Sequence, residues 1–283
     1  MSERDSNAAG EIGPSPSGQL AQSMPSALSA GFGRIYSFLE WFGDLAIFSW
    51  QVARAAVTPP FEFRELFRQL DEIGSMSLPL VAAAGAAIGA VLSLEARYSL
   101  TRFGAKSMLP AAIVYSVIHE TGPIITGLIV SGRVGAGIGA ELASMKVTEQ
   151  IDAIEASAVN PYKLLAVTRI LACILMLPLL TLAADFCGVL VGWITQALAE
   201  PLSLQQFINS AFKGSNLNDF LPPTFKTAVF GLIIGLVSCF QGMRTQGGAA
   251  GVGRAATSSV VLSSLFVILA DVVLVKFIII FFP

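Results

Sequence analysis

The chain has 283 residues, of which 54% are hydrophobic and 13% are charged, and its mean hydropathy is +0.72. Soluble domains carry roughly a quarter of charged residues, so this composition is typical of a membrane protein. The formal net charge of −2 leaves no basic excess to neutralise phosphates, which argues against a nucleic-acid partner. Cys173, Cys187 and Cys239 all lie in apolar runs, which indicates buried side chains and not a disulfide framework or a metal site.

Residues 1–31 are rich in Ser, Ala, Gly and Pro and contain no apolar stretch. A secretory signal would need a basic start followed by an apolar core. We therefore expect a disordered cytoplasmic tail.

Residues 32–57 combine Trp and Phe with charges spaced along the segment. Glu40 and Asp44 would each be costly in the middle of a bilayer, so this pattern favours a helix lying in the membrane interface. A sixth membrane span is the alternative. A polar connector follows, so that residues 32–72 precede the membrane domain.

Five apolar runs are long enough to cross a bilayer core, which takes about 20 helical residues. They cover residues 73–94, 107–132, 170–199, 227–243 and 255–282. The sequence therefore predicts an all-α membrane protein with about five transmembrane helices in a domain covering residues 73–283.

The basic residues predict the orientation, because Lys and Arg prefer the cytoplasmic side. With a cytoplasmic N-terminus, eleven of them fall in cytoplasmic segments and four in outer segments. We therefore expect a multi-pass protein whose segment between the second and third spans faces the cytoplasm.

Four pairs of glycines have the G-x-x-x-G spacing that lets membrane helices approach closely. The pairs are Gly85 and Gly89, Gly135 and Gly139, Gly188 and Gly192, and Gly231 and Gly235. They predict a compact bundle and a helix-packed dimer.

Ionisable residues interrupt three of the spans: His119 and Glu120 the second, Asp185 the third, and Asp271 and Lys276 the last. Charges at such depth pair inward or line a wet cavity. We interpret Asp185 and Asp271 as structural.

Glu120 has two interpretations. It could line a cavity for a lipid headgroup with Arg254 as its partner, or form a structural ion pair that fixes helix register. His119, next to Glu120, is a further candidate for the wall of that cavity, with a packed, hydrogen-bonded histidine as the alternative. Because H-E-T-G-P is not the H-E-x-x-H of zinc proteases, no metal is predicted.

Three side chains near the outer end of the first span could form the apolar wall of such a cavity. Core packing is the alternative for each of them. They are Leu92, Leu94 and Tyr98.

An acidic segment, "VTEQIDAIEASAVNP", lies between the second and third spans. Val147, Ile151, Ile154 and Ala158 recur at helical spacing, so we expect an amphipathic helix over residues 147–158. Thr148 could cap its start, and Asn160-Pro161 marks its expected end. A solvated connector and a helix that docks on a cytoplasmic motor are both compatible with this pattern.

The stretch from residue 119 to residue 172 resembles the MlaE/YrbE permease family, the membrane subunits of ABC transporters that work with MCE proteins. The resemblance extends from about residue 60 to the end of the chain. The matching motif residues are Glu120, Gly122 and Pro123, then Gly132 and Arg133, then Glu149, Asp152 and Ala153, and finally Pro161 and Arg169. His119, Gln150 and Thr168 depart from the family pattern.

The resemblance implies a homodimer in the bacterial inner membrane that binds two ATPase subunits. It also implies a periplasmic MCE ring, in many systems a STAS-domain protein, and phospholipids as substrate. Coupling to the ATPase would involve Glu149, Gln150, Asp152, Ala153 and Glu155. The sequence has no Gly-Lys dipeptide and hence no phosphate-binding G-x-x-x-x-G-K-[ST] loop, so ATP is expected on the partner and no cofactor or catalysis on this chain.

Two other classes of function have some support in the sequence. An ion-coupled carrier could relay protons through the buried carboxylates, although no internal repeat is evident. An intramembrane enzyme would need a nucleophile and base or a metal cluster, and one histidine with scattered carboxylates offers little.

Overall fold

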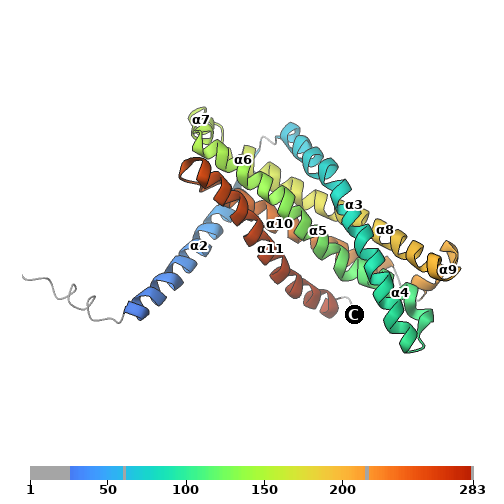
Figure 1. The fold of residues 1–283 in the computed structure, drawn as a ribbon. Helices are drawn as coiled ribbons and strands as arrows, with labels where there is room; N and C mark the ends of the chain where they lie inside the picture. The colour runs from blue at the N-terminus through green and yellow to red at the C-terminus, as the bar shows by residue number, and fades with distance from the viewer. Residues whose placement is uncertain (1–25, 60–61, 214–216, 282–283) are drawn as a thin grey trace, which may run out of the picture. The chain divides into compact units, whose positions relative to one another are not determined.

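The computed structural model describes residues 26–59, 62–213 and 217–281, and side chains within 39–59, 62–213 and 221–280. These ranges are helical, with no strand (Figure 1). The elements are α2 (Ser26–Val57), α3 (Phe63–Arg102), η1 (Lys106–Met108), α4 (Leu109–Ser116), η2 (Val117–Thr121), α5 (Gly122–Val130), η3 (Ser131–Gly135), α6 (Ala136–Val147), α7 (Gln150–Ala156), η4 (Tyr162–Val167), α8 (Thr168–Ala199), α9 (Leu204–Ala211), α10 (Leu217–Met243) and α11 (Gly248–Phe281).

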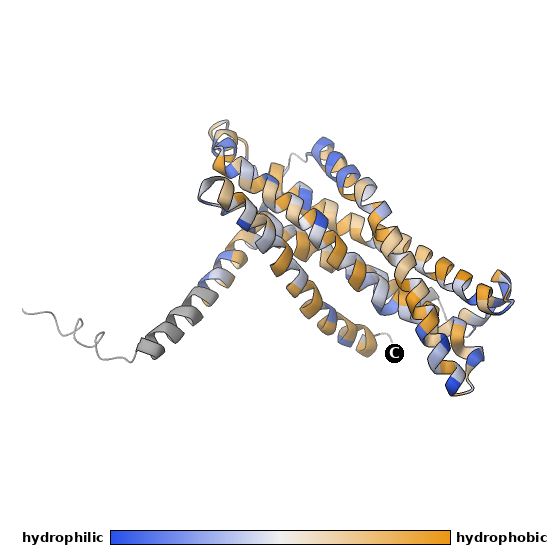
Figure 2. Ribbon diagram, in the orientation of Figure 1, coloured by the Kyte–Doolittle hydropathy of each residue, from blue (hydrophilic) through white to orange (hydrophobic). Residues whose placement is uncertain are grey.

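Within the described residues, five helical stretches are long and apolar enough to cross a membrane, which confirms the expected all-α, five-span membrane fold. They are Phe63–Arg102, Lys106–Val147, Tyr162–Ala199, Leu221–Met243 and Gly248–Ile280. Most extend well beyond the apolar runs seen in the sequence. Apolar residues dominate the middle of the spans, and polar residues gather at both ends of α3 and at the end that carries α7 (Figure 2).

Helix α2 is not among these candidate spans. Its part before Phe48 belongs to a separate unit, and the rest belongs to the unit that holds the five spans. In that second unit, Phe48, Val52 and Ala55 are buried at helical spacing, and the Phe48 ring lies 5.6 Å from that of Phe240. Of the predicted tail, residues 1–25 lie outside the described residues, and α2 already begins at Ser26.

The second span is one rod that contains two π-helical turns, η2 and η3, between α4, α5 and α6. The N–H of Gly122 donates to the carbonyl of Val117, five residues back. Pro123 has no N–H to donate to the carbonyl four residues before it. The wide turn lets the helix continue although this hydrogen bond is missing. The π turn carries His119 and Glu120, which are both half-buried.

Helix α8 touches two neighbours at backbone distance, because glycines leave room for the close approach. A Cβ on Gly89 of α3 would lie 2.0 Å from the carbonyl oxygen of Gly188, and one on Gly85 would lie 2.3 Å from that of Ala184. A Cβ on Gly231 of α10 would lie 2.4 Å from the Cys173 carbonyl oxygen. The expected compact packing is therefore confirmed, and these contacts lie within one chain.

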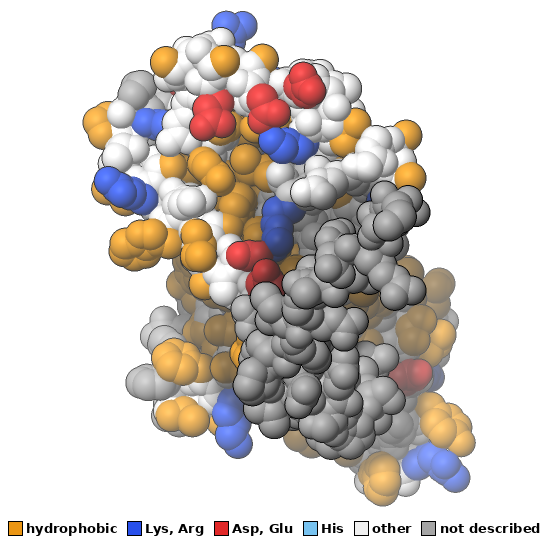
Figure 3. All heavy atoms as spheres, turned by 90° about the vertical axis from the view of Figure 1, so that its left-hand side faces the viewer, with side chains coloured by type: hydrophobic (Ala, Val, Ile, Leu, Met, Phe, Trp, Pro, Cys, Tyr) orange, Lys and Arg blue, Asp and Glu red, His pale blue; other side chains and the backbone are white. Residues whose placement is uncertain are grey.

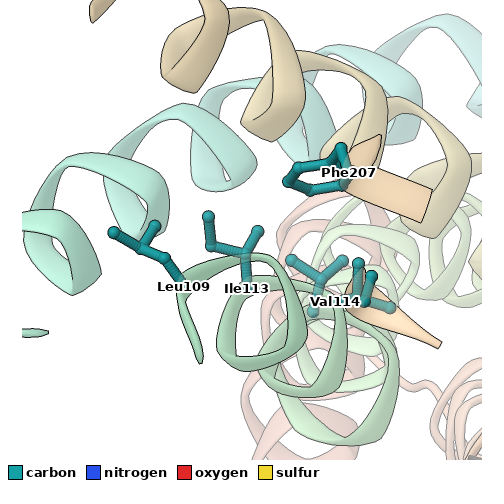
Figure 4. Close-up of a cluster of buried hydrophobic side chains, with 6 residues drawn as sticks. Leu109, Ile113, Val114 and Phe207 are labelled. Carbon is teal, nitrogen blue, oxygen red and sulfur yellow. The ribbon is translucent and has the colours of Figure 1, made fainter. Parts of the chain in front are cut away.

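The end of the bundle that carries α9 is closed by an apolar cluster at the contact of α4 with α9. Its buried residues are Leu109, Ile113, Val114, Val117, Phe207 and Ala211. In Figure 4 the Phe207 ring lies over Ile113 and Val114. Ser203 and Gln206 form a capping box that starts α9, which holds Phe207 in place. We call this end the α9 end and the opposite one the α7 end.

We expect Gly89→Ala to destabilise the chain by about 1–3 kcal/mol, because the added methyl group must push α3 away from α8. Gly137→Ala is the matched control, since a Cβ there meets nothing within 4 Å. Thermal unfolding of the two purified variants in detergent measures the difference. Equal melting temperatures would show that the α3–α8 contact is not close.

Candidate functional site

A buried ion cluster joins three spans. The Lys226 Nζ of α10 lies 3.0 Å from a carboxylate oxygen of Glu120 in η2 and 2.9 Å from one of Asp271 in α11. The side chain of Lys226 is 1% exposed and that of Asp271 is 4% exposed, whereas that of Glu120 is 46% exposed. Lys226 and Asp271 therefore form the closed part of the cluster, and Glu120 presents its carboxylate to a more open space.

Attraction between the Lys226 ammonium and the two carboxylates holds the cluster together. A lysine ammonium inside a membrane is costly unless an opposite charge accompanies it. Two carboxylates meet this one ammonium, so the cluster as a whole is neutral or anionic. An ion pair that fixes helix register, one of the two interpretations of Glu120, is present in the structure.

The partner of Glu120 is Lys226, and the suggested pairing with Arg254 is wrong. Arg254 lies 17 residues before Asp271 on α11, which corresponds to about 25 Å along a helix. Because Asp271 lies beside Lys226, Arg254 is far from Glu120 and exposed at the α7 end. The sequence shows Lys226 as a lone cation at the start of an apolar run, and its role in pairing was missed.

His119 is half-buried and makes a ring contact, which agrees with the packed alternative. Its ring stacks on that of Tyr115 one turn earlier, with 3.9 Å between the centroids and 19° between the planes. The described residues contain no group of three or more His, Cys, Asp or Glu side chains placed to hold a metal ion.

The three predicted wall residues of α3 do not line one cavity with Glu120 in the single chain. Leu92 packs against the cluster at the α9 end, where core packing accounts for it. Leu94 and Tyr98 are 59% and 67% exposed on the outside of the bundle.

The acidic helix α7 covers only Gln150–Ala156, shorter than the expected 147–158. Val147 ends α6, and Glu149 adopts a left-handed conformation, φ 59°, that turns the chain sharply between the two helices. Thr148 does not cap α7, because its hydroxyl donates to the Ser144 carbonyl of α6. Pro161 starts η4 instead of ending α7, since Ala158 with φ 60° has already ended it.

The predicted coupling residues all face outward at the α7 end. Ile151 is buried and anchors the helix, and Asp152 pairs with Lys146 of α6 at 2.7 Å. Acidic side chains gather at the top of the face in Figure 3, at the level of α7 in Figure 1. The exposed residues are Glu149, Gln150, Asp152, Ala153 and Glu155.

Most of the remaining motif residues make structural contacts. Gly122 packs against the Asp185 carboxylate, where a Cβ would lie 1.8 Å from Oδ1. Arg133 donates to Ser77 of α3 at 2.6 Å. Arg169, 1% exposed, pairs with Glu141 of α6 at 2.8 Å.

One motif glycine and one motif proline have simpler surroundings. Gly132 is exposed, and a Cβ there would meet nothing within 4 Å. Pro123 lies at the start of α5 behind the π turn.

These features define a multi-pass helical membrane protein with a buried ion cluster and an exposed acidic helix at one end. The family described as Permease MlaE matches residues 66–277. A "Probable ABC transporter permease protein" of Rickettsia typhi is 38% identical over 83% of this chain and 90% of its own length. One of the same description from Synechocystis is 32% identical over 74% of this chain and 79% of its own. The chain belongs to the MlaE permease family, and it is therefore a permease of the ABC transporter class, which implies an ATPase partner.

A plant relative is also similar over most of the chain. The chloroplastic protein TRIGALACTOSYLDIACYLGLYCEROL 1 of Arabidopsis thaliana is 30% identical over 84% of this chain and 68% of its own length.

We expect Lys226→Met to destabilise the chain by about 3–5 kcal/mol, because it leaves Asp271 buried without a counter-ion. Lys276→Met is the control, since Lys276 is exposed on α11 and its loss should cost less than about 0.5 kcal/mol. Adding Asp271→Leu to Lys226→Met should recover most of the lost stability. Thermal unfolding in detergent measures all three, and equal effects of the two lysine substitutions would contradict the ion cluster.

Proposed function

We propose that this chain is the non-catalytic permease subunit of a transporter that moves phospholipids or related lipids between the bacterial inner membrane and a periplasmic MCE protein. A separate ABC ATPase would bind and hydrolyse the ATP. The exposed acidic helix α7, anchored on the bundle by Ile151, is the observation that carries this proposal. Family membership supports the transporter class, and the plant relative named after a galactolipid supports a lipid substrate.

Helix α7 is well placed to receive force from an ATPase. Sharp turns at Glu149 and Ala158 join it to the second and third spans, so a displacement of α7 acts on both. The second span contains the π turns η2 and η3, and such turns are common at functional sites. In our proposal, ATP-driven closure of the partner moves α7, and the second span carries that motion to Glu120.

The lipid path is proposed to lie between two copies of this chain. Leu94 and Tyr98 on α3, together with Val261, Leu265 and Val272 on α11, present apolar surface outside the bundle. The carboxylate of Glu120, the exposed member of the ion cluster, would then meet the polar part of a lipid in the space between the protomers. An MCE ring would cover the α9 end, and a STAS-domain protein would bind the ATPase.

An ion-coupled carrier is the second candidate, and the ion cluster favours it. Three carboxylates, those of Glu120, Asp185 and Asp271, lie in spans beside or near a single buried lysine, and such groups can relay protons. Lipid transport by this chain after deletion of the ATPase would favour the carrier, whereas complete loss would favour the ABC mechanism.

We expect replacement of both Glu149 and Asp152 by Ala to weaken ATPase binding about 30-fold or more, as for the loss of an interface hot spot worth 2 kcal/mol. Glu95→Ala is the control, because Glu95 is an exposed acid near the α9 end. Co-purification of the ATPase with the tagged chain, and ATP turnover of the complex, give the readouts. Normal values for the double variant would contradict coupling through α7.

We expect the α7 end to face the cytoplasm. In a chain whose three native cysteines are replaced by alanine, Ala153→Cys should resist a membrane-impermeant thiol reagent in spheroplasts and react after permeabilisation. Ser107→Cys, exposed near the α9 end, should react in both cases. Labelling of position 153 in intact spheroplasts would reverse the orientation and exclude a cytoplasmic motor at α7.

A further inference from the structure

A cavity of about 930 Å³ lies between α8 and α10, apart from the Lys226 cluster. Its size falls in the range of ligand pockets, about 300–1,000 Å³. One face of α8 forms most of its wall, α10 forms the other side, and Ile118 and Phe212 complete it. The residues of α8 are Ile174, Leu175, Pro178, Leu179, Leu182, Asp185, Phe186 and Val189, and those of α10 are Leu221, Thr224, Phe225 and Ala228.

The cavity lies on the α9 side of the contact between α8 and α10. Gly231 and Gly235 of α10 bring that helix against the backbone of α8 at Cys173 and Ile170. The lining residues of α10 all precede this contact and lie toward the α9 end. Leu179 and Phe186 are 57% and 69% exposed, so the cavity is a groove that opens sideways, toward the lipid of a bilayer.

Asp185 is the one acidic side chain in this apolar wall. It is 5% exposed, and among the residues that the structure describes neither of its oxygens has a hydrogen-bond partner. A buried carboxyl group without a partner is costly, and more so inside a membrane. The wall of the groove therefore contains a carboxyl group whose hydrogen-bonding capacity is unused.

A proline in the same wall removes one backbone donor from α8. Pro178 interrupts α8 and has no N–H, so the carbonyl of Ile174 lacks its helical donor. Both residues line the groove. An occupant with a hydrogen-bond donor is favoured over a hydrocarbon alone.

The length and the apolar lining of the groove favour a lipid chain as its occupant. The lining residues of α8 span Ile174 to Val189, about 22 Å at 1.5 Å per residue. Along this length the lining is apolar except at Asp185 and Thr224, and the groove opens sideways, which suits an extended acyl chain.

We propose that this groove is a lipid-binding site that takes, from the bilayer, an acyl chain whose polar end carries a hydroxyl or ammonium donor for Asp185. The proposal stands apart from the proposed transport function, because it concerns binding from the bilayer by the chain itself.

The groove also contacts the helices of the ion cluster. Phe225 and Ala228 flank Lys226 on α10, and Asp185 packs against Gly122 at the end of the π turn that carries Glu120. An occupant therefore lies against two of the three elements that hold the cluster.

The test uses the full-length chain in lipid nanodiscs and two photoactivatable probes with the same diazirine-bearing chain. One is a monoacylglycerol, which has two hydroxyl donors, and the other is the methyl ester, which has none. We expect the monoacylglycerol to label peptides of α8 and α10 about 3- to 10-fold more than the ester, as one hydrogen bond would produce. Asp185→Leu should abolish this preference while labelling by the ester persists.

A second variant tests the groove independently of Asp185. Leu179→Trp should reduce labelling by both probes, and Leu190→Trp, exposed on α8 outside the groove, should leave it unchanged. Melting temperatures show that the variants fold. Equal labelling by the two probes in the unmodified chain, a preference that survives Asp185→Leu, or cross-linking of the groove to a partner protein's helix in the native membrane would each overturn the proposal.

Discussion

Close backbone contact between α8 and its two neighbours is the constraint on which the rest of this structure depends. Inside a bilayer, helices gain no hydrophobic stabilisation from one another, so they associate through close packing and a few polar contacts. Gly85 and Gly89 on α3, and Gly231 and Gly235 on α10, let α8 approach to backbone distance on two sides. This contact sets the position of α10, and hence that of Lys226.

The polar interior follows from that packing. With α10 in place, the ammonium of Lys226 reaches Asp271 on α11 and Glu120 on the second span. The π turn before Pro123 rotates the helix so that Glu120 faces the cluster, a position that a regular helix would not guarantee. Toward the α9 end, α10 leaves room beside α8, and the apolar groove with Asp185 lies there. One set of glycine contacts thus positions both the ion cluster and the groove.

The α7 end has a different character, because its residues are exposed. Helix α7 has two turns, one buried anchor in Ile151 and acidic side chains in water. Behind it, Arg169 is buried against Glu141 and fastens α8 to α6. An exposed helix on a fixed base is suited to bind another protein, whereas the buried charges behind it serve the fold.

The sequence by itself determined the membrane class, the five spans and the acidic segment between the second and third, because hydropathy and charge are local properties of the chain. It also indicated the close packing, since four pairs of glycines have the spacing that lets membrane helices approach closely. Only the tertiary structure decided which charges meet. Glu120 pairs with Lys226 and not with Arg254, because Arg254 lies about 25 Å along α11 from Asp271, the residue of α11 beside Lys226. The length of α7 was also decided there, since left-handed residues at Glu149 and Ala158 shorten it. The groove at Asp185 could not be seen in the sequence, because it arises where two helices far apart in the chain stop touching.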